Sequence, residues 1–234
     1  MPEGPEVWIL SKAINNFYSN DKTSSIGKHL IVKDINENWS FGLTGKANIT
    51  TNNELVKIDS GWIYGDKIKY ENYYESVKDL GLDWMQASRE DLEKEVDKWI
   101  KSKQKLAALI LDQSKICGIG VAWGSEILFK ADLRPDMKAK DQVLNKLVDS
   151  IIEIRESVKE TYEKELNNVL QVCKINENDL KLREFINDWY VNLYDVREMN
   201  IYEKGSKLKV LGRSWWVIYL LKYLTIIISN NNKT

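Results

Sequence analysis

The stretch KLAALILDQSKICGIGVAWGSEILFKADLRP, residues 105–135, contains two helical segments with a tight break between them. We expect a short helix over residues 105–112 and a second helix over about residues 122–131. Gly118-Ile119-Gly120 lies between them. Closely spaced glycines interrupt a helix because they readily adopt turn conformations. The stretch therefore predicts a helix, a glycine-rich turn and a second helix.

The chain before this stretch has a different character. Pro5 and Glu6 are typical of the first turn of a helix, because proline lacks the N–H group that would be unpaired there. Apolar residues then recur at helical spacing through about Tyr18, namely Val7, Leu10, Ile14 and Phe17. Short strand-like runs with turn signals between them follow from about residue 24 to 74. These features predict an antiparallel sheet or sandwich that is led by one helix.

Beyond residue 81 the pattern becomes mainly helical. Ser88-Arg89-Glu90-Asp91 predicts a capping box at the start of a helix. Further helices are predicted over about residues 141–168 and 180–190, and residues 200–217 have the character of a hairpin. The predicted fold class is α+β, with a β-rich half and a helical half that meet near residues 76–87.

The composition excludes several classes of protein. The 234 residues are 43% hydrophobic and carry a formal net charge of −1, which is typical of a globular protein and not of a disordered tail or a fibre. Two cysteines and one histidine, Cys117, Cys173 and His29, cannot supply a four-ligand zinc site. We expect the cysteines to be small core residues and the histidine to lie in a strand. The neutral charge argues at first against a nucleic-acid partner.

No signal for secretion or membrane insertion is found in the sequence. The start MPEGPEVWILSK has acidic residues where a signal peptide needs positive charge. The most apolar run, residues 218–228, contains Lys222 and is shorter than the roughly 20 residues that span a bilayer. We therefore expect an intracellular, soluble protein with no membrane partner.

Position 2 is a proline, and removal of the initiator methionine would leave Pro2 as a secondary amine. An α-amino group has a pKa of about 7.7–8.0, so part of it is nucleophilic near neutral pH. Such an amine condenses with a sugar aldehyde to a cationic iminium ion, which makes the C2′ proton acidic and permits elimination of the 3′ phosphate. Glu3 lies beside a helix N-terminus, which favours a carboxylate, and could transfer protons. Alone, these residues are equally compatible with an ordinary exposed chain end.

The start MPEGPEV together with residues 105–135 resembles the formamidopyrimidine-DNA glycosylase/endonuclease VIII family. That family begins with PE-x-PE and continues with K-x-x-LLDQ-x-x-x-x-GIGN-x-x-x-x-EILF-x-A-x-x-P. The residues that fall on this pattern at its spacing are Lys105, Leu111-Asp112-Gln113, Gly118-Ile119-Gly120, Glu126-Ile127-Leu128-Phe129, Ala131 and Pro135. Weaker similarities at residues 27–28, 42–45, 80–83 and 212–215 occur in family order.

The resemblance implies two domains. Residues 1–80 would form a β-sandwich headed by the catalytic helix. Residues 81–234 would form a helix–two-turn–helix domain, with a DNA-binding finger at about residues 194–217. That finger has no cysteines, so it is expected to be a zincless β-hairpin, and no metal or cofactor is implied.

The resemblance also implies roles for particular residues. The catalytic group would consist of Pro2 as the Schiff-base nucleophile, Glu3 as the acid and base, and Lys28 near the phosphate, with Glu6 as a supporting residue. The DNA-binding residues would be Lys105, Gly118, Gly120, Val121, Arg213 and Leu43, with backbone N–H groups around residues 118–121 receiving a phosphate. Without the joint pattern, the lysines are equally well ordinary surface residues, the glycines helix breaks, and Arg213 a residue stacked on an aromatic ring.

Several positions depart from the family pattern. The asparagine after GIG is Val121, which removes one side-chain contact at the phosphate site, and Leu43 stands where a methionine often fills the gap left by the extruded base. Residues 71–75 contain no arginine to reach the opposite strand, although Tyr73 or Tyr74 could substitute. We therefore expect weak reading of the opposite base and good activity on single-stranded DNA.

The sequence thus predicts a bifunctional DNA glycosylase and abasic-site lyase that acts as a monomer on damaged single-stranded or duplex DNA. Gly4 favours the endonuclease VIII-like branch, and hence oxidised pyrimidines and hydantoins as substrates. The alternatives are a non-catalytic binder of damaged DNA with the same fold, and a helical interaction module. The charge is unevenly distributed: residues 101–140 carry 8 basic and 4 acidic groups, and residues 201–234 carry 6 and 1. This distribution suits a protein that contacts DNA along one groove.

Overall fold

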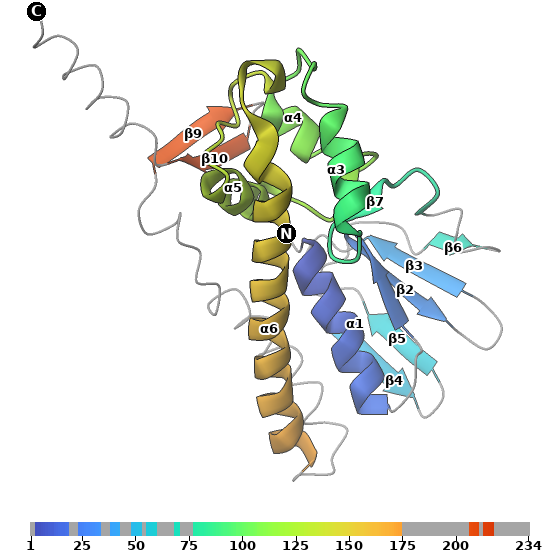
Figure 1. Ribbon diagram of the computed structural model, residues 1–234. Helices are drawn as coiled ribbons and strands as arrows, with labels where there is room; N and C mark the ends of the chain where they lie inside the picture. Colours follow the sequence, from blue (N-terminus) through green and yellow to red (C-terminus); the bar gives the residue numbers. More distant parts are fainter. Residues whose placement is uncertain are drawn as a thin grey trace, which may run out of the picture.

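The computed structural model describes residues 3–18, 23–33, 38–42, 48–52, 55–59, 68–70, 77–174, 206–210 and 213–217. Within these ranges the protein combines helices with antiparallel sheets, so the predicted α+β class is confirmed (Figure 1). Pro2, Leu43, residues 71–75, the helix predicted over residues 180–190 and the apolar run 218–228 lie outside the described residues.

The first helix, α1, spans Gly4–Tyr18, as the sequence predicts. Glu3 precedes its first turn, and the Glu6 carboxylate accepts the backbone N–H of Glu3 at 2.7 Å, which satisfies one of the donors that a helix start leaves unpaired. Val7 and Ile9 are fully buried. The helix packs against β1 and against the long helix α6, so it contacts both halves of the chain.

The strands of the N-terminal half form one sheet and one separate hairpin. The four-stranded antiparallel sheet has the order β1-β2-β3-β6. Its strands are β1 Thr23–Ile26, β2 His29–Lys33, β3 Asn38–Gly42 and β6 Ile68–Tyr70. The separate antiparallel hairpin consists of β4 Asn48–Asn52 and β5 Leu55–Asp59. The strand-like runs of the sequence therefore do form antiparallel pairs.

The described part of the C-terminal half is mainly helical. Its helices are α3 Arg89–Asp97, α4 Leu106–Ile110, α5 Val121–Lys130 and α6 Leu147–Lys174. The helix predicted from residue 141 begins only at Leu147, because two 3-10 turns, η1 Ala139–Asp141 and η2 Leu144–Lys146, precede it. A short parallel pair that the sequence did not predict, β7 Leu82–Asp83 and β8 Ile116–Cys117, connects the start of this half to the segment before α5.

Among the residues whose burial is described, the apolar core cluster lies mostly in the helical half. Trp84, Trp99, Leu106, Ile110 and Ile127 are almost completely buried within it, and Trp8 and Ile9 of α1 join the same cluster. Burial of apolar area of this kind stabilises a fold by about 25 cal/mol per Å². The N-terminal helix is therefore held by the core of the C-terminal half, and it lies beside α6 in Figure 1.

Helix α3 begins with the side-chain cap that the sequence predicts. The Ser88 hydroxyl accepts the backbone N–H of Asp91 at 3.1 Å and donates to the Asp91 carboxylate at 2.6 Å. We expect Ser88→Ala to lower the free energy of unfolding by about 1 kcal/mol in urea titrations, whereas Ser88→Thr should retain most of the cap. Equal unfolding midpoints for wild type and Ser88→Ala would show that the cap contributes nothing.

A second antiparallel hairpin, β9 Ser206–Val210 and β10 Arg213–Val217, follows late in the chain. It forms within the segment where the sequence predicts a hairpin, and β10 contacts α5 (Figure 1). Arg213 opens β10 and is paired in register with Val210. The hairpin therefore lies close to the helix that follows the glycine-rich turn.

Two kinds of feature are not found within the described ranges. None of the helices there combines the length and apolar character needed to cross a bilayer. Among the same residues, no three His, Cys, Asp or Glu side chains gather in a way that could hold a metal ion.

Candidate functional site

The Glu3 carboxylate is buried at the N-terminus of α5. Its Oε2 atom accepts the backbone N–H groups of Gly120 at 2.8 Å and Trp123 at 3.1 Å, and its Oε1 atom accepts that of Ala122 at 3.0 Å. The Glu3 residue is only 6% exposed. A helix start offers unpaired N–H groups and a partial positive charge, so it binds a carboxylate as it would bind an anionic ligand. This contact joins two segments that are 117 positions apart.

Two glycines permit this approach. Gly118 has φ +91°, a conformation that favours glycine, and its carbonyl accepts the backbone N–H of Gly4 at 2.7 Å. Gly120 needs no positive φ, but a Cβ atom there would overlap with Cδ and Oε1 of Glu3. The Gly118-Ile119-Gly120 break is thus the surface against which the start of α1 docks.

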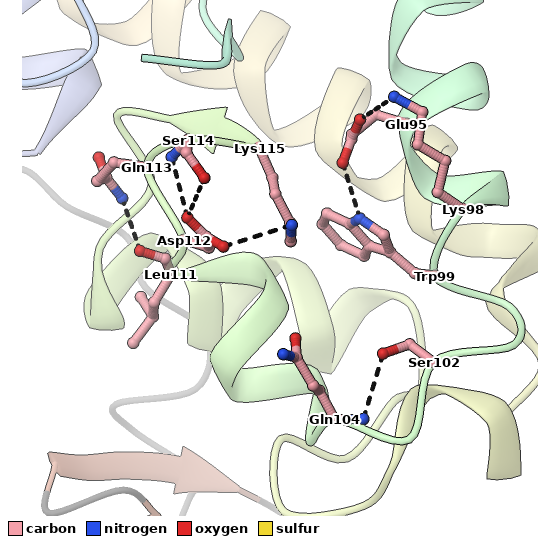
Figure 2. Close-up of polar contacts among 10 residues, drawn as sticks. All are labelled: Glu95, Lys98, Trp99, Ser102, Gln104, Leu111, Asp112, Gln113, Ser114 and Lys115. Carbon is pink, nitrogen blue, oxygen red and sulfur yellow. Dashed lines mark hydrogen bonds and ion pairs between the residues drawn. The ribbon is translucent and has the colours of Figure 1, made fainter. Parts of the chain in front are cut away.

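The turn that carries these glycines is braced by Gln113. Its side-chain N–H₂ group donates to the carbonyls of Leu111 and Ile119, both at 3.0 Å, and its side-chain oxygen accepts the N–H of Gly118 at 2.9 Å. Figure 2 shows the contact with Leu111 at the end of α4. One amide side chain therefore links the end of α4 to both sides of the turn.

The neighbouring Asp112 stabilises the same connection from the other side. Its carboxylate accepts the backbone N–H of Ser114 at 3.0 Å and the Ser114 hydroxyl at 2.6 Å. The Nζ atom of Lys115 lies 3.4 Å from Oδ2 of Asp112 (Figure 2). The hydroxyl bond from Ser114 is the main cause that lowers the pKa of Asp112. The Leu111-Asp112-Gln113 sequence thus acts locally, by fixing the turn before α5.

Glu6 lies behind Glu3 and is completely buried. Besides the backbone N–H of Glu3, its carboxylate accepts the indole N–H of Trp123 at 3.1 Å and the hydroxyl of Tyr162 at 3.1 Å. Trp123 belongs to α5 and Tyr162 to α6. Glu6 is therefore the point where the three helices α1, α5 and α6 are joined by polar contacts.

Opposing influences act on the protonation of Glu3. Burial raises its pKa most, and the negative charge of Glu6 raises it further, whereas the Lys28 cation and the N–H groups of Trp123 and Ala122 lower it. The net direction is upward. A carboxyl group with a raised pKa holds its proton to higher pH, so Glu3 is suited to donate a proton under conditions where an ordinary glutamate is ionised.

Lys28 reaches this region through a tight turn between β1 and β2. Gly27 has φ +56°, and a Cβ atom there would lie 2.9 Å from the Cys117 sulfur, so the turn packs directly against the segment before α5. Burial raises the pKa of the Cys117 thiol to about 12, and burial lowers the pKa of His29. Both are therefore neutral at physiological pH, which leaves Lys28 as the charge that this turn brings toward Glu3.

The charge of Lys28 should be visible in the titration of Glu3. Because Lys28 lowers the pKa of Glu3, Lys28→Met should raise that pKa, which NMR of the Glu3 carboxyl carbon measures. Lys98→Met is the control, since its side chain is 70% exposed on the C-terminal side of α3 and pairs with Glu95. An unchanged titration midpoint of Glu3 in Lys28→Met would contradict this coupling.

The other predicted residues lie in two places. Lys105 is exposed and directly precedes α4, where its backbone forms a bridge with Lys138. Val121 is the first residue of α5 and is half-buried. The expectation that the N–H groups of Gly118 and Gly120 receive a phosphate needs correction, because Gly118 donates to Gln113 and Gly120 donates to Glu3.

The structure adds three residues to the site that the sequence did not point to individually. Gln113 and Trp123 lie inside the decisive stretch 105–135, yet a linear pattern does not tell which of its side chains brace a turn. Tyr162 lies in the middle of α6, where one aromatic residue on an amphipathic helix is indistinguishable from an ordinary core residue. Only the packing of α6 against α1 places its hydroxyl at Glu6.

Comparison with known proteins relates this geometry to a known fold. No protein-family model matches the chain, and no curated protein matches it in sequence. Among solved structures, a Lactococcus lactis formamidopyrimidine-DNA glycosylase bound to DNA with an abasic site matches over 92% of this chain and 96% of its own, with a TM-score of 0.56 and 18% identity. The MutM protein of Thermus thermophilus matches over 69% and 76%, with a TM-score of 0.51 and 16% identity.

A further match is MutM in complex with DNA that contains carbocyclic 8-oxo-G. It covers 93% of this chain and 98% of its own, with a TM-score of 0.59 and 16% identity. Identities this low show a shared fold. The chain therefore has the fold of the formamidopyrimidine-DNA glycosylases, as the sequence resemblance predicts.

Proposed function

We propose that this chain is a DNA glycosylase and abasic-site lyase that acts through Pro2. The observation that carries the proposal is the docking of Glu3: its buried carboxylate on the N-terminus of α5 holds the residue next to Pro2 against the Gly118–Gly120 turn. The shared fold with formamidopyrimidine-DNA glycosylases supports the same function. The burial of Glu3 directly after Pro2 supports a role for this part of the chain.

The proposed reaction requires an amine nucleophile, a proton donor and a positive charge near the departing phosphate. The unprotonated nitrogen of Pro2 forms a bond to C1′ as the bond from C1′ to the base breaks, and the base leaves with a proton. A proton delivered to O4′ opens the sugar ring and leaves an iminium ion between Pro2 and C1′. Glu3 is suited to deliver that proton, because burial and the neighbouring Glu6 raise its pKa.

Strand cleavage then follows by elimination. The iminium ion withdraws electrons from C2′, which loses a proton as the 3′ phosphate leaves, and a second elimination releases the 5′ phosphate. Water hydrolyses the remaining iminium bond and regenerates Pro2. Lys28, in the turn that packs beside Cys117, is suited to stabilise a departing phosphate by its charge.

We propose damaged DNA as the partner. The solved Lactococcus lactis relatives were bound to DNA with an abasic site and with an oxidised pyrimidine.

In this chain the two domains would be residues 1–80 and 81–234. The helix–two-turn–helix element would comprise α4, the turn and α5, and the zincless finger would carry Arg213 at the start of β10, near α5. Lys105, the N–H group of Val121 and Leu43 would contact the DNA, and oxidised pyrimidines and hydantoins are the proposed substrates.

The proposal is tested with the full chain and an oligonucleotide that contains one abasic site, in the presence of borohydride, which reduces an iminium ion to a stable amine. Wild type should give a covalent complex, whereas Pro2→Gly should give much less. A chain with an uncleaved N-terminal extension should give none, because its amine is displaced. Glu90→Gln is the control for loss of a carboxylate, since Glu90 is exposed on α3.

The result also separates the alternatives. Binding to an abasic-site analogue without covalent capture would identify a non-catalytic damaged-DNA binder. The absence of any salt-dependent DNA affinity would exclude both DNA functions and leave an interaction module.

A further inference from the structure

Glu6 links the start of α1 to both α5 and α6 through its buried carboxylate. The Glu6 carboxylate is fully buried, and it accepts three donors from three segments: the backbone N–H of Glu3 at 2.7 Å, the Trp123 indole at 3.1 Å and the Tyr162 hydroxyl at 3.1 Å. A buried carboxylate is unfavourable unless such donors surround it, and here each of these buried donors needs the carboxylate as its acceptor. The carboxylate therefore ties these three groups to one another and brings a charge beside Glu3.

The position of this carboxylate has consequences for Glu3. The N–H group that Glu6 accepts is that of Glu3, so Glu6 fixes the backbone of the residue that follows the proposed nucleophile. Its charge also acts on Glu3, whose side chain faces Glu6 from α1, Lys28 from the β1–β2 turn and the N–H groups at the start of α5. Orientation and charge at Glu3 therefore both depend on where the Glu6 carboxylate points.

From these contacts we infer that Tyr162 and Trp123 are positioning residues for the Pro2–Glu3 pair, acting through Glu6. The Tyr162 side chain belongs to α6, is 1% exposed and donates its hydroxyl to Glu6. That hydroxyl holds one oxygen of Glu6, and the Trp123 indole holds the same oxygen, so the other oxygen stays directed to the N–H of Glu3. This inference rests on the proposed function and assigns α6 a part in it.

Loss of one donor should have a defined consequence. Without the Tyr162 hydroxyl, Glu6 loses one of the donors that hold its orientation and stabilise its charge, so that charge acts less strongly on Glu3. Because that charge raises the pKa of Glu3, the pKa should fall in Tyr162→Phe. The backbone N–H of Glu3 should also be held less firmly, which lowers the rate of the chemical steps without affecting the binding of DNA.

The test compares the full-length wild type with Tyr162→Phe, which removes only the hydroxyl oxygen. Under single-turnover conditions on abasic-site DNA, the cleavage rate constant should fall by on the order of tenfold, while the concentration of DNA at half-maximal rate should stay within about twofold. The limb of the pH–rate profile due to Glu3 should move to lower pH. Val158→Ala is the matched control, because it alters a buried, apolar position on the same helix without removing a polar contact.

A second readout needs no substrate. The titration of the Glu3 carboxyl carbon, followed by NMR in the full chain, should have its midpoint at lower pH in Tyr162→Phe than in wild type. If Tyr162→Phe is too unstable to measure, Trp123→Phe removes the other donor and should shift the same midpoint in the same direction.

Each outcome decides one claim. Wild-type rate, pH profile and NMR midpoint in Tyr162→Phe would overturn the positioning role and leave the proposed function intact. If Tyr162→Phe loses only as much rate as Val158→Ala and keeps its pH profile, the positioning role is also overturned. Such a loss of rate would reflect lower stability alone. If wild type forms no covalent complex, the proposed function fails, and the NMR midpoint still shows whether Tyr162 acts on Glu3.

Discussion

Glu3→Gln should lower the rate of strand cleavage at an abasic site by roughly 100-fold or more, the usual effect of removing a general acid or base. Glutamine has nearly the same shape, and its carbonyl oxygen can still accept an N–H group from the start of α5. The change removes the proton transfer, and it also replaces one accepting oxygen by an NH₂ group, so part of the N–H contacts from α5 is lost. Single-turnover cleavage assays at several pH values measure the effect, with Glu90→Gln as the control.

The same substitution should change how the stability of the protein depends on pH. Because the pKa of Glu3 is raised in the folded state, the folded chain holds more protons than the unfolded chain between the ordinary glutamate pKa and the raised value. The contribution of Glu3 to stability is therefore lost as the pH rises through this window. Urea unfolding should show that the stability of wild type relative to Glu3→Gln falls between about pH 4 and about pH 7.5.

Loss of cleavage activity together with loss of this pH dependence would support a proton-transfer role for Glu3. Full cleavage activity with lower stability would mean that Glu3 serves only to dock α1 on α5.

Gly120→Ala should lower cleavage activity about as far as Glu3→Gln, by roughly 100-fold. The backbone of Gly120 is extended, with φ −114°, so alanine adopts it without strain. The effect comes from contact, because the added methyl group would occupy the place of the Glu3 carboxyl group. Glu3 must then leave the N–H groups of α5, and the start of α1 should lose its docking. Thermal unfolding should show a lower Tm in addition to the loss of activity.

A double variant separates the two effects. Glu3→Ala removes the group that the new methyl would meet, so Glu3→Ala/Gly120→Ala should be more stable than the sum of the two single changes predicts, while it stays inactive. Additive losses of stability in the double variant would show that Glu3 and Gly120 do not share this contact.

The sequence predicted those parts of the fold that depend on local pattern. The glycine break at residues 118–120 lies between α4 and α5, the cap at Ser88 begins α3, and the late hairpin forms at residues 206–217. In each case residues close together in the chain determine the conformation, so their order suffices to predict it.

Features that depend on tertiary packing were not predicted. The pattern at residues 105–135 suggested that the N–H groups of Gly118 and Gly120 face a phosphate, yet Gln113 and Glu3 occupy them. A helix start binds any suitable anion, and only the packing of α1 against this turn determines that the anion is a carboxylate of the same chain. The sequence also placed the start of α6 six residues too early. The 3-10 turns at Ala139–Asp141 and Leu144–Lys146 have a composition that resembles that of an α-helix.

We infer that the amine of Pro2, the neighbour of the docked Glu3, forms the covalent intermediate. The most direct test of this claim is to digest the borohydride-trapped complex of the full-length protein with DNA and to determine by mass spectrometry which residue carries the sugar remnant. We predict that the remnant is attached to the nitrogen of Pro2 in a peptide that lacks Met1. A remnant on a lysine such as Lys28, or an N-terminal peptide that carries no adduct, would contradict the claim.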